Sequence, residues 1–434
     1  MTDINVYARR RASMLAHMRQ GIAIVPTAPE HVRNRDSEYL YRFDSYFYYL
    51  CGFQEPEAVL VLVVGAQTQS VLFCREKNPE RETWDGFRYG PEAAKEAFGV
   101  DAAYPIGQLD EKLPLLMANQ PALYYAPGMD SDWDARIMRW LNQVRAQSRT
   151  GVSAPHRIYD VRAALDEMRI FKDEHEVALM RRAAGISAKA HERAMRATRP
   201  GRMEYEIEAE LLYEFRRHGA QFPAYWPIVA GGANACVLHY SDNSARLEDG
   251  ALLLIDAGCE LDGYASDITR TFPVNGKFDG AQKDVYELVL AAQAAAIAAT
   301  RPGAAWDAPH EAAVRVLAQG MIDFGLCQGS LEQVLETGDY KRFYMHRTGH
   351  WLGLDVHDAG EYKLDGKWRP LKEGMTLTVE PGCYIRPAEA VPKAYWNIGV
   401  RIEDDVLVTA DGCEVITAAT PKSIAEIEAL VGKD

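Results

Sequence analysis

The stretch LLLIDAGCELDGYASDITRTF, residues 252–272, places two aspartates in apolar surroundings. Its first seven residues, 252–258, predict a strand buried on both faces because they are almost wholly apolar, yet this run contains Asp256. An Asp-Gly turn then leads into a second predicted strand at 264–272, which contains Asp267. The stretch therefore predicts a hairpin whose strands each present a carboxylate.

Two later segments repeat this combination. TLTVEPG, at 376–382, predicts a strand with Glu380 on its polar face, and IGVRIEDDVLV, at 398–408, predicts one with Glu403 opposite an apolar row. A lone carboxylate in a strand commonly lies at a solvated edge or in an ion pair, and Arg401 is a candidate partner for Glu403. Four buried carboxylates that face one another would repel, however, so they need protons or cations.

The segment HRTGHWLGLDVHD, residues 346–358, contains three histidines. His346 and His350 have the spacing of the zinc-protease pattern H-E-x-x-H, but Arg347 stands in place of glutamate and two glycines disfavour a helix. A single histidine is often only a hydrogen-bonded core residue. One imidazole added to four carboxylates makes an oxygen-rich ligand set, which suits two Mn²⁺ ions, with Co²⁺, Zn²⁺ or Fe²⁺ as alternatives. The pattern favours a dinuclear hydrolase and identifies no substrate.

Length and composition narrow the class of protein. A chain of 434 residues predicts two domains. The formal charge of −14 argues against a nucleic-acid-binding surface. Seven scattered cysteines without a C-x-x-C pair fit a reducing compartment. The charged N-terminus lacks the apolar segment of a signal peptide, and the longest aliphatic run is too short to cross a bilayer. These features predict a cytoplasmic protein with no membrane partner.

The order of predicted elements separates two halves. Strands alternate with helices up to a polar link at 150–162, which predicts an α/β layer. Two helix pairs follow, and an R-P-G sequence after one helix of each pair suggests a duplicated unit. The predicted helices are 4–20, 91–98, 132–147, 170–198, 204–218, 280–300 and 307–325, and the predicted early strands are 21–26, 57–65 and 70–76.

Four blocks, LIDAGCELDGYASDITRTF, HRTGHWLGLDVHD, TVEPGCY and IGVRIEDD, resemble the signature blocks of the pita-bread metallopeptidases, and aminopeptidase P most closely. Residues 33–62 resemble the N-terminal domain of that family. The resemblance implies an α/β N-terminal domain at 1–170 and an α+β pita-bread catalytic domain at 171–434. It also implies an exopeptidase that releases the first residue of peptides with proline at the second position.

The resemblance implies five metal ligands: Asp256, Asp267, His350, Glu380 and Glu403. Asp267 and Glu403 would bridge two divalent ions, Asp256 would complete one site, and His350 with Glu380 would complete the other. A hydroxide between the ions would attack the peptide carbonyl, and Glu380 would shuttle the proton.

The resemblance also implies roles for residues around the metals. His357 and His239 would contact substrate, and Arg401 would hold a ligand carboxylate. Asp36 would lie near the substrate amine. Trp84 resembles part of a loop that reaches a neighbouring subunit's active site, which implies a tetramer or dimer, although an ordinary exposed loop is an equal alternative. His346 has the weakest case, as a structural residue or one that supports the ligands, and Arg347 departs from the glycine usual in the family.

Other functions remain open at this point. Prolidases share the ligands but cleave dipeptides, and they generally have a longer insertion than the 23-residue separation of Glu380 and Glu403. Non-catalytic peptide-binding relatives and creatinase-like members usually lose ligands that are intact here. Methionine aminopeptidases lack the N-terminal domain.

Overall fold

The computed structural model describes residues 4–433 and divides the chain into two compact units. The first unit ends at Met168 and the second begins at Arg169, close to the division expected at 170. Within the described residues, no helix combines the length and apolar character needed to cross a membrane.

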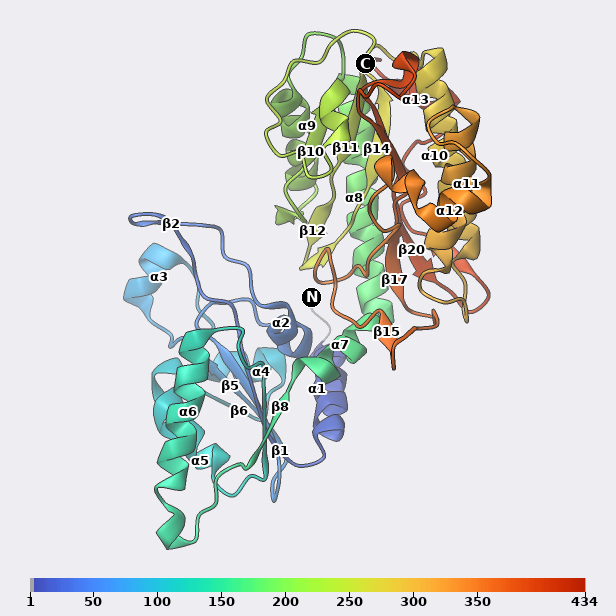
Figure 1. Ribbon diagram of the computed structural model, residues 1–434. Coiled ribbons are helices and arrows are strands. Elements are labelled where there is room, and N and C mark those ends of the chain that lie inside the picture. Colours follow the sequence, from blue (N-terminus) through green and yellow to red (C-terminus); the bar gives the residue numbers. More distant parts are fainter. Residues whose placement is uncertain (1–3, 434) are drawn as a thin grey trace. The chain divides into compact units, whose positions relative to one another are not determined.

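The N-terminal unit is built on a six-stranded mixed sheet with the strand order β6-β5-β4-β1-β7-β8 (Figure 1). The strands are β1 (Gly21–Pro26), β4 (Val59–Val64), β5 (Gln69–Cys74), β6 (Ala102–Pro105), β7 (Ala122–Tyr125) and β8 (Arg157–Asp160), and β2 (Val32–Asn34) with β3 (Ser37–Glu38) forms a separate hairpin. Its helices are α1 (Ile4–Met18), α2 (Ser45–Cys51), α3 (Pro79–Asp85), α4 (Gly90–Phe98), α5 (Leu109–Met117) and α6 (Ser131–Arg145). The prediction that 150–162 is only a link was wrong, because β8 pairs in parallel with β7 there.

The central strand β1 explains why this unit is layered. Ile22 and Ile24 alternate with Ala23 and Val25, and all four are buried. Ile22 and Ile24 share one face and pack in a cluster with apolar residues of α5 and α6. A strand buried on both faces needs cover on both sides, as an α/β sheet provides.

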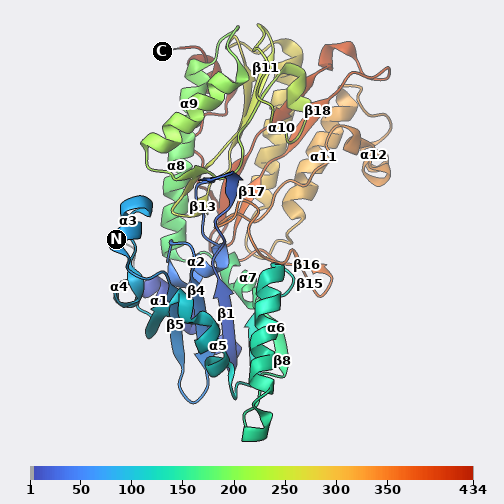
Figure 2. The same cartoon turned by 90° about the vertical axis from the view of Figure 1, so that its left-hand side faces the viewer.

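The C-terminal unit contains two helix pairs, α8 with α9 and α10 with α11, which lie beside its strands (Figure 2). The helices are α7 (Arg162–Ile170), which crosses the division between the units, α8 (Glu174–Ala197), α9 (Glu204–Arg217), α10 (Gly280–Ala299), α11 (Ala308–Asp323), α12 (Leu331–Thr337) and α13 (Ile424–Leu430). The predicted single helix 170–198 was wrong at its start. Lys172 leaves the helical path to donate its backbone N–H to Gly374, and Asp173 then caps α8 with a capping box.

The strands of the C-terminal unit form several small sheets. They are β9 (Phe222–Pro223), β10 (Ile228–Gly231), β11 (Leu252–Asp256), β12 (Cys259–Leu261), β13 (Tyr264–Ala265), β14 (Thr269–Pro273), β15 (Lys363–Leu364), β16 (Lys367–Trp368), β17 (Thr376–Val379), β18 (Gly382–Ile385), β19 (Ile398–Arg401), β20 (Asp404–Val408) and β21 (Cys413–Val415). Each of the predicted strands 264–272, 376–382 and 398–408 is broken in two. The halves belong to different sheets: β11 pairs with β14 and β12 with β13, whereas β17 pairs with β20 and β18 with β19.

Close passage of two chain segments produces one of these breaks. A Cβ added to Gly258, between β11 and β12, would lie 1.7 Å from the carbonyl oxygen of Ser266, between β13 and β14. Ser266 donates its backbone N–H to Cys259, and Ala257 donates to Ile268, so the two interruptions hydrogen-bond to each other. Both strands of the hairpin therefore leave one sheet and enter another at the same position along the hairpin.

Candidate active site

The four predicted carboxylate ligands lie at the strand breaks. Asp256 is the last residue of β11, Asp267 lies between β13 and β14, Glu380 between β17 and β18, and Glu403 between β19 and β20. Together with His350 they line one cavity of about 500 Å³ in the C-terminal unit. These five residues are far apart in the sequence, and the fold brings them together in the lining of this cavity.

Asp267, His350 and Glu403 form the tightest group. One ligand atom of each lies within 4.8 Å of those of the other two. His350 Nδ1 is 2.9 Å from the carbonyl oxygen of Trp351, which directs Nε2 toward the carboxylates. Nε2 lies 3.5 Å from Asp267 Oδ2 and 3.6 Å from Glu380 Oε1. A backbone carbonyl that fixes one ring nitrogen and frees the other is the usual support of a metal-binding histidine.

Asp256 is oriented by two neighbours. Arg401 Nη2 donates to Asp256 Oδ2 at 2.6 Å, and the hydroxyl of Tyr225 contacts both Asp256 Oδ1 and Asp267 Oδ1. Arg401 thus pairs with Asp256 and not with Glu403, the partner suggested by sequence proximity. Arg401 still acts on Glu403 through an intermediate, because Arg401 Nε donates to Thr269 Oγ1, which donates to Glu403 Oε2 at 2.6 Å.

Glu380 is supported from its own strand and from the histidine loop. Thr378 Oγ1 donates to Glu380 Oε1 at 3.3 Å, and the backbone N–H of Glu380 donates to Thr348. His346 Nδ1 lies 3.7 Å from Glu380 Oε2 and 2.7 Å from the carbonyl oxygen of Arg347. His346 Nε2 is 2.9 Å from the hydroxyl of Tyr384.

The ionised forms of three of these carboxylates, Glu380, Asp256 and Glu403, are disfavoured in the site. Burial raises the pKa of Glu380 to about 7 and raises the pKa of Asp256. Burial together with the charges of Asp267 and Glu380 holds the pKa of Glu403 well above its usual range. Buried acids that repel one another require either protons or cations, so this oxygen-rich set with one imidazole fits divalent metal ions.

The surroundings of His350 likewise favour its protonated, positively charged form. Burial opposes its protonation, yet the hydrogen bond to Asp267 and the charge of Glu380 raise the pKa of His350 to about 9. Asp267 responds in the opposite direction: burial favours its neutral form, but His350 holds its pKa below the usual range. A cation near Asp267 and Glu380 is therefore electrostatically favoured, which is the property a metal site needs.

The remaining predicted residues of the C-terminal unit line the same cavity. His239, His346, His357 and Arg401 all contribute to its wall. His357 is exposed and its ring centroid lies 4.2 Å from that of His350. His239 follows β10 and is exposed. Both imidazoles can therefore meet a molecule that enters the cavity.

Asp36 and Trp84 belong to the N-terminal unit. Asp36 lies in the exposed turn between β2 and β3, and Trp84 lies on α3 with 82% of its surface exposed. Their predicted contacts with substrate and with a neighbouring subunit stay predictions.

The comparisons with known proteins agree with this geometry. The model of metallopeptidase family M24 matches residues 178–410, and the aminopeptidase P N-terminal domain matches residues 7–124. The chain belongs to metallopeptidase family M24. The match confirms the predicted fold class, an α/β N-terminal domain followed by a pita-bread catalytic domain.

Relatives of this M24 chain match over nearly the whole length. The Xaa-Pro aminopeptidase of Haemophilus influenzae is 46% identical over 98% of this chain and 96% of its own. The structure of Pseudomonas aeruginosa aminopeptidase PepP is 52% identical, has a TM-score of 0.97 and covers 99% of this chain and 98% of that one. Zn-substituted Escherichia coli aminopeptidase P in complex with product is 43% identical, with a TM-score of 0.96, and covers 99% and 98%.

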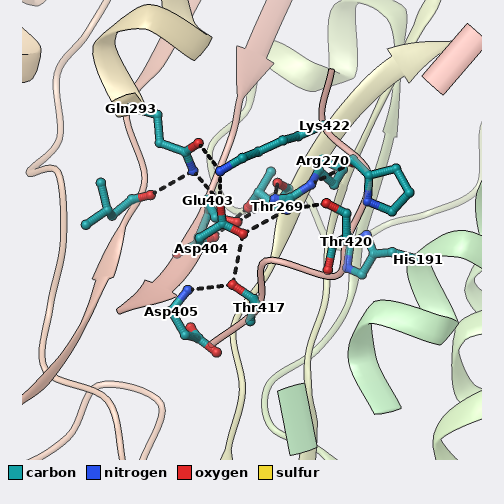
Figure 3. Close-up of polar contacts among 12 residues, drawn as sticks. His191, Thr269, Arg270, Gln293, Glu403, Asp404, Asp405, Thr417, Thr420 and Lys422 are labelled. Carbon is teal, nitrogen blue, oxygen red and sulfur yellow. Dashed lines mark hydrogen bonds and ion pairs between the residues drawn. The ribbon is translucent and has the colours of Figure 1, made fainter. Parts of the chain in front are cut away.

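Sequence reasoning missed several residues that build this M24 site. Tyr225 lies outside the four motif blocks and Tyr384 ends the block TVEPGCY, and only the fold shows that their hydroxyls reach Asp256 and Arg401. Behind Glu403, the buried side chains of Arg270 and Asp404 form a network with the partly exposed Lys422 (Figure 3). The sequence contains one signal for it: three acids follow one another in IGVRIEDD, and the sequence pattern assigns a role to Glu403 only.

Arg270 ties this network to the ligand strands. Its side chain is fully buried, and Nη1 donates to the carbonyl oxygens of Thr269 and Glu403 at 2.9 and 2.6 Å. Nη2 donates to Asp404 Oδ1 at 2.8 Å. The guanidinium therefore joins β14 to the break before β20, at the level where Glu403 leaves the strand.

Proposed function

We propose that this M24 chain is a metal-dependent exopeptidase that releases the N-terminal residue from peptides with proline at the second position. The observation that carries the proposal is the convergence of all five predicted ligands on one cavity wall, from four strand breaks and one loop. The Xaa-Pro aminopeptidase of Haemophilus influenzae, which matches along nearly the whole chain, supports the substrate class.

Two divalent metal ions are the proposed cofactors, with Mn²⁺ as the native choice. Asp256, Asp267, His350, Glu380 and Glu403 would hold them, since these side chains supply mainly oxygen ligands. Bound ions supply an activated water and polarise the carbonyl of the scissile bond. Asp267 and Glu403 would serve both ions.

The chain's own groups then act on the substrate. Glu380, which lies in the cavity among the proposed ligands, would accept a proton from the attacking water and return it to the proline nitrogen that leaves. His357, exposed beside His350, would donate a hydrogen bond to the carbonyl oxygen as negative charge develops. His239 would contact the substrate from the loop after β10, and Arg401 would keep Asp256 in place.

Further parts of the proposal concern the assembly and its location. Asp36 would lie near the substrate amine, and the exposed Trp84 would contact a neighbouring copy in a tetramer or dimer. Seven free cysteines fit a reducing cytoplasm. Light scattering that finds only a fully active monomer would contradict the assembly.

The decisive experiment compares an Xaa-Pro-Xaa tripeptide with the corresponding Xaa-Pro dipeptide. We expect Mn²⁺-loaded protein to cleave the tripeptide, to lose activity in EDTA and to regain it when Mn²⁺ is restored. Exclusive cleavage of the dipeptide would identify a prolidase. Activity that is indifferent to chelation would refute the metal-dependent mechanism.

A further inference from the structure

Arg347 is a cation on the cavity wall that the proposed mechanism does not use. It lines the 500 Å³ cavity beside Gly349 and His350, and its side chain is exposed. Its guanidinium carbon lies 5.0 Å from the ring centre of Trp368, which gives the side chain an aromatic support. Across residues 4–433, the guanidinium of Arg347 makes neither a hydrogen bond nor an ion pair.

The cavity has unequal charge across its wall. Four carboxylates converge at the ligand cluster, and the other arginine of the wall, Arg401, is committed to Asp256 and Tyr384. Arg347 is therefore the arginine of this wall whose donors are open to an incoming molecule. A peptide whose N-terminus lies at the ligand cluster, as the proposed function requires, carries a carboxylate at its other end, which this guanidinium can bind.

The dimensions allow a short peptide to reach both ends. A sphere of the cavity's volume, about 500 Å³, is about 10 Å across. The C-terminal carboxylate of an Xaa-Pro-Xaa peptide lies two residues beyond the scissile bond, and two extended residues span about 7 Å. A carboxylate on the residue after proline therefore falls within the width of the cavity.

We propose that Arg347 is a specificity-determining residue that binds a carboxylate on the leaving side of the substrate, C-terminal to proline. This inference rests on the proposed function, because it requires the peptide to enter with its amine at the metal ligands. The planar guanidinium can donate two parallel hydrogen bonds to a carboxylate, which a lysine cannot reproduce. The same chemistry is supplied by the C-terminus of a tripeptide or by an acidic side chain after proline.

The test measures kcat and KM of the Mn²⁺-loaded full chain on matched peptides. One arm compares Ala-Pro-Ala as the free acid with its C-terminal amide, and the other compares Ala-Pro-Asp amide with Ala-Pro-Asn amide. We expect a KM lower by roughly tenfold for whichever carboxylate is bound, the size of one charge-assisted contact, with kcat little changed. The advantage should shrink in 1 M salt because Arg347 is exposed.

The variant Arg347→Met removes the charge and keeps the length of the side chain, so it should erase the advantage. Lys363→Met is the matched control: Lys363 stacks on the same Trp368 at 4.2 Å but does not line the cavity. It should retain the advantage. Equal KM values of the wild-type protein for the two peptides of each pair, or an advantage that survives in Arg347→Met, would overturn the role of Arg347 and leave the proposed function standing. No cleavage of any of these peptides would overturn the proposed function and this inference with it.

Discussion

Replacement of Asp404 by asparagine should destabilise the C-terminal unit without changing the shape of the residue. Asp404 is fully buried. Its carboxylate accepts hydrogen bonds from four side chains (Figure 3): Arg270 Nη2 at 2.8 Å, Thr417 Oγ1 at 2.8 Å, Gln293 Nε2 at 3.0 Å and Lys422 Nζ at 2.6 Å. Asparagine removes the charge that balances two cations, and its amide places a donor where donors already point.

The size of the effect follows from burial. Arg270 and Asp404 have no exposed side-chain surface, so solvent cannot replace the lost charge, although 29% of Lys422 is exposed. Breaking a buried ion pair costs about 3–5 kcal/mol in free energy of unfolding. For a unit that runs from Arg169 to Asp434, an unfolding entropy of about 2.1 cal/mol/K per residue converts this into a fall in Tm of about 5–9 °C.

Thermal unfolding followed by circular dichroism on metal-free protein measures this change. Glu414→Gln is the control, because Glu414 pairs with Arg181 at the surface, where 41% and 49% of the side chains are exposed. Such exposed pairs contribute about 0–1 kcal/mol, so the control should melt within about 2 °C of wild type. An Asp404→Asn variant that melts as close to wild type as the control does would refute the reasoning.

Three further predictions concern the ligands and a crossing glycine. The metal-free protein should lose stability from pH 7 to 9, because Asp267 and Glu380 overcome burial and raise the pKa of His350 to about 9, so the folded state keeps a proton that the unfolded state releases above about 6.5. The free energy of unfolding should fall by up to about 1.4 kcal/mol per pH unit, as denaturant titrations can measure, and saturating Mn²⁺ should flatten this slope. A free energy of unfolding that rises from pH 7 to 9 would contradict the assignment. Glu380→Ala should lower kcat by about 10²–10⁴ with an unchanged circular dichroism spectrum, and near-normal turnover would exclude its proton role. Gly258→Ala should lower Tm severely, since its Cβ would lie 1.7 Å from a backbone oxygen, whereas Gly412→Ala, with nothing within 4 Å, should not.

The features of this structure that depend on neighbouring residues could be predicted from the sequence. The apolar run of 252–255 depends only on neighbours in the chain, so the strand that it forms could be predicted from the sequence pattern. The argument about buried charge also needed only the sequence pattern. Carboxylates set in apolar runs predicted a cation site, and the structure places Asp267 and Glu403 within reach of one ion.

The strand breaks could not be predicted from the sequence in the same way. Alternation continues through Glu380 and Glu403, so the pattern predicts unbroken strands there. At the break between β17 and β18, Pro381 is a local signal because it has no backbone N–H, but the packing beside the break is not local: a Cβ on Gly349 would lie 2.1 Å from the carbonyl oxygen of Thr378. The partners of such contacts are far apart in sequence, and no local preference encodes them.

The breaks explain how four carboxylates can share one wall. Each of these strands contributes one carboxylate, so the spacing of the ligands is set between strands and not along them. At the breaks, three of the ligands donate their backbone N–H to another segment of the chain. The N–H of Asp267 donates to Asp405, that of Glu403 to Thr269, and that of Glu380 to Thr348. Because Asp267 and Glu403 each depend on the opposite hairpin, neither hairpin could position its own ligands alone, and the site exists only where the two meet.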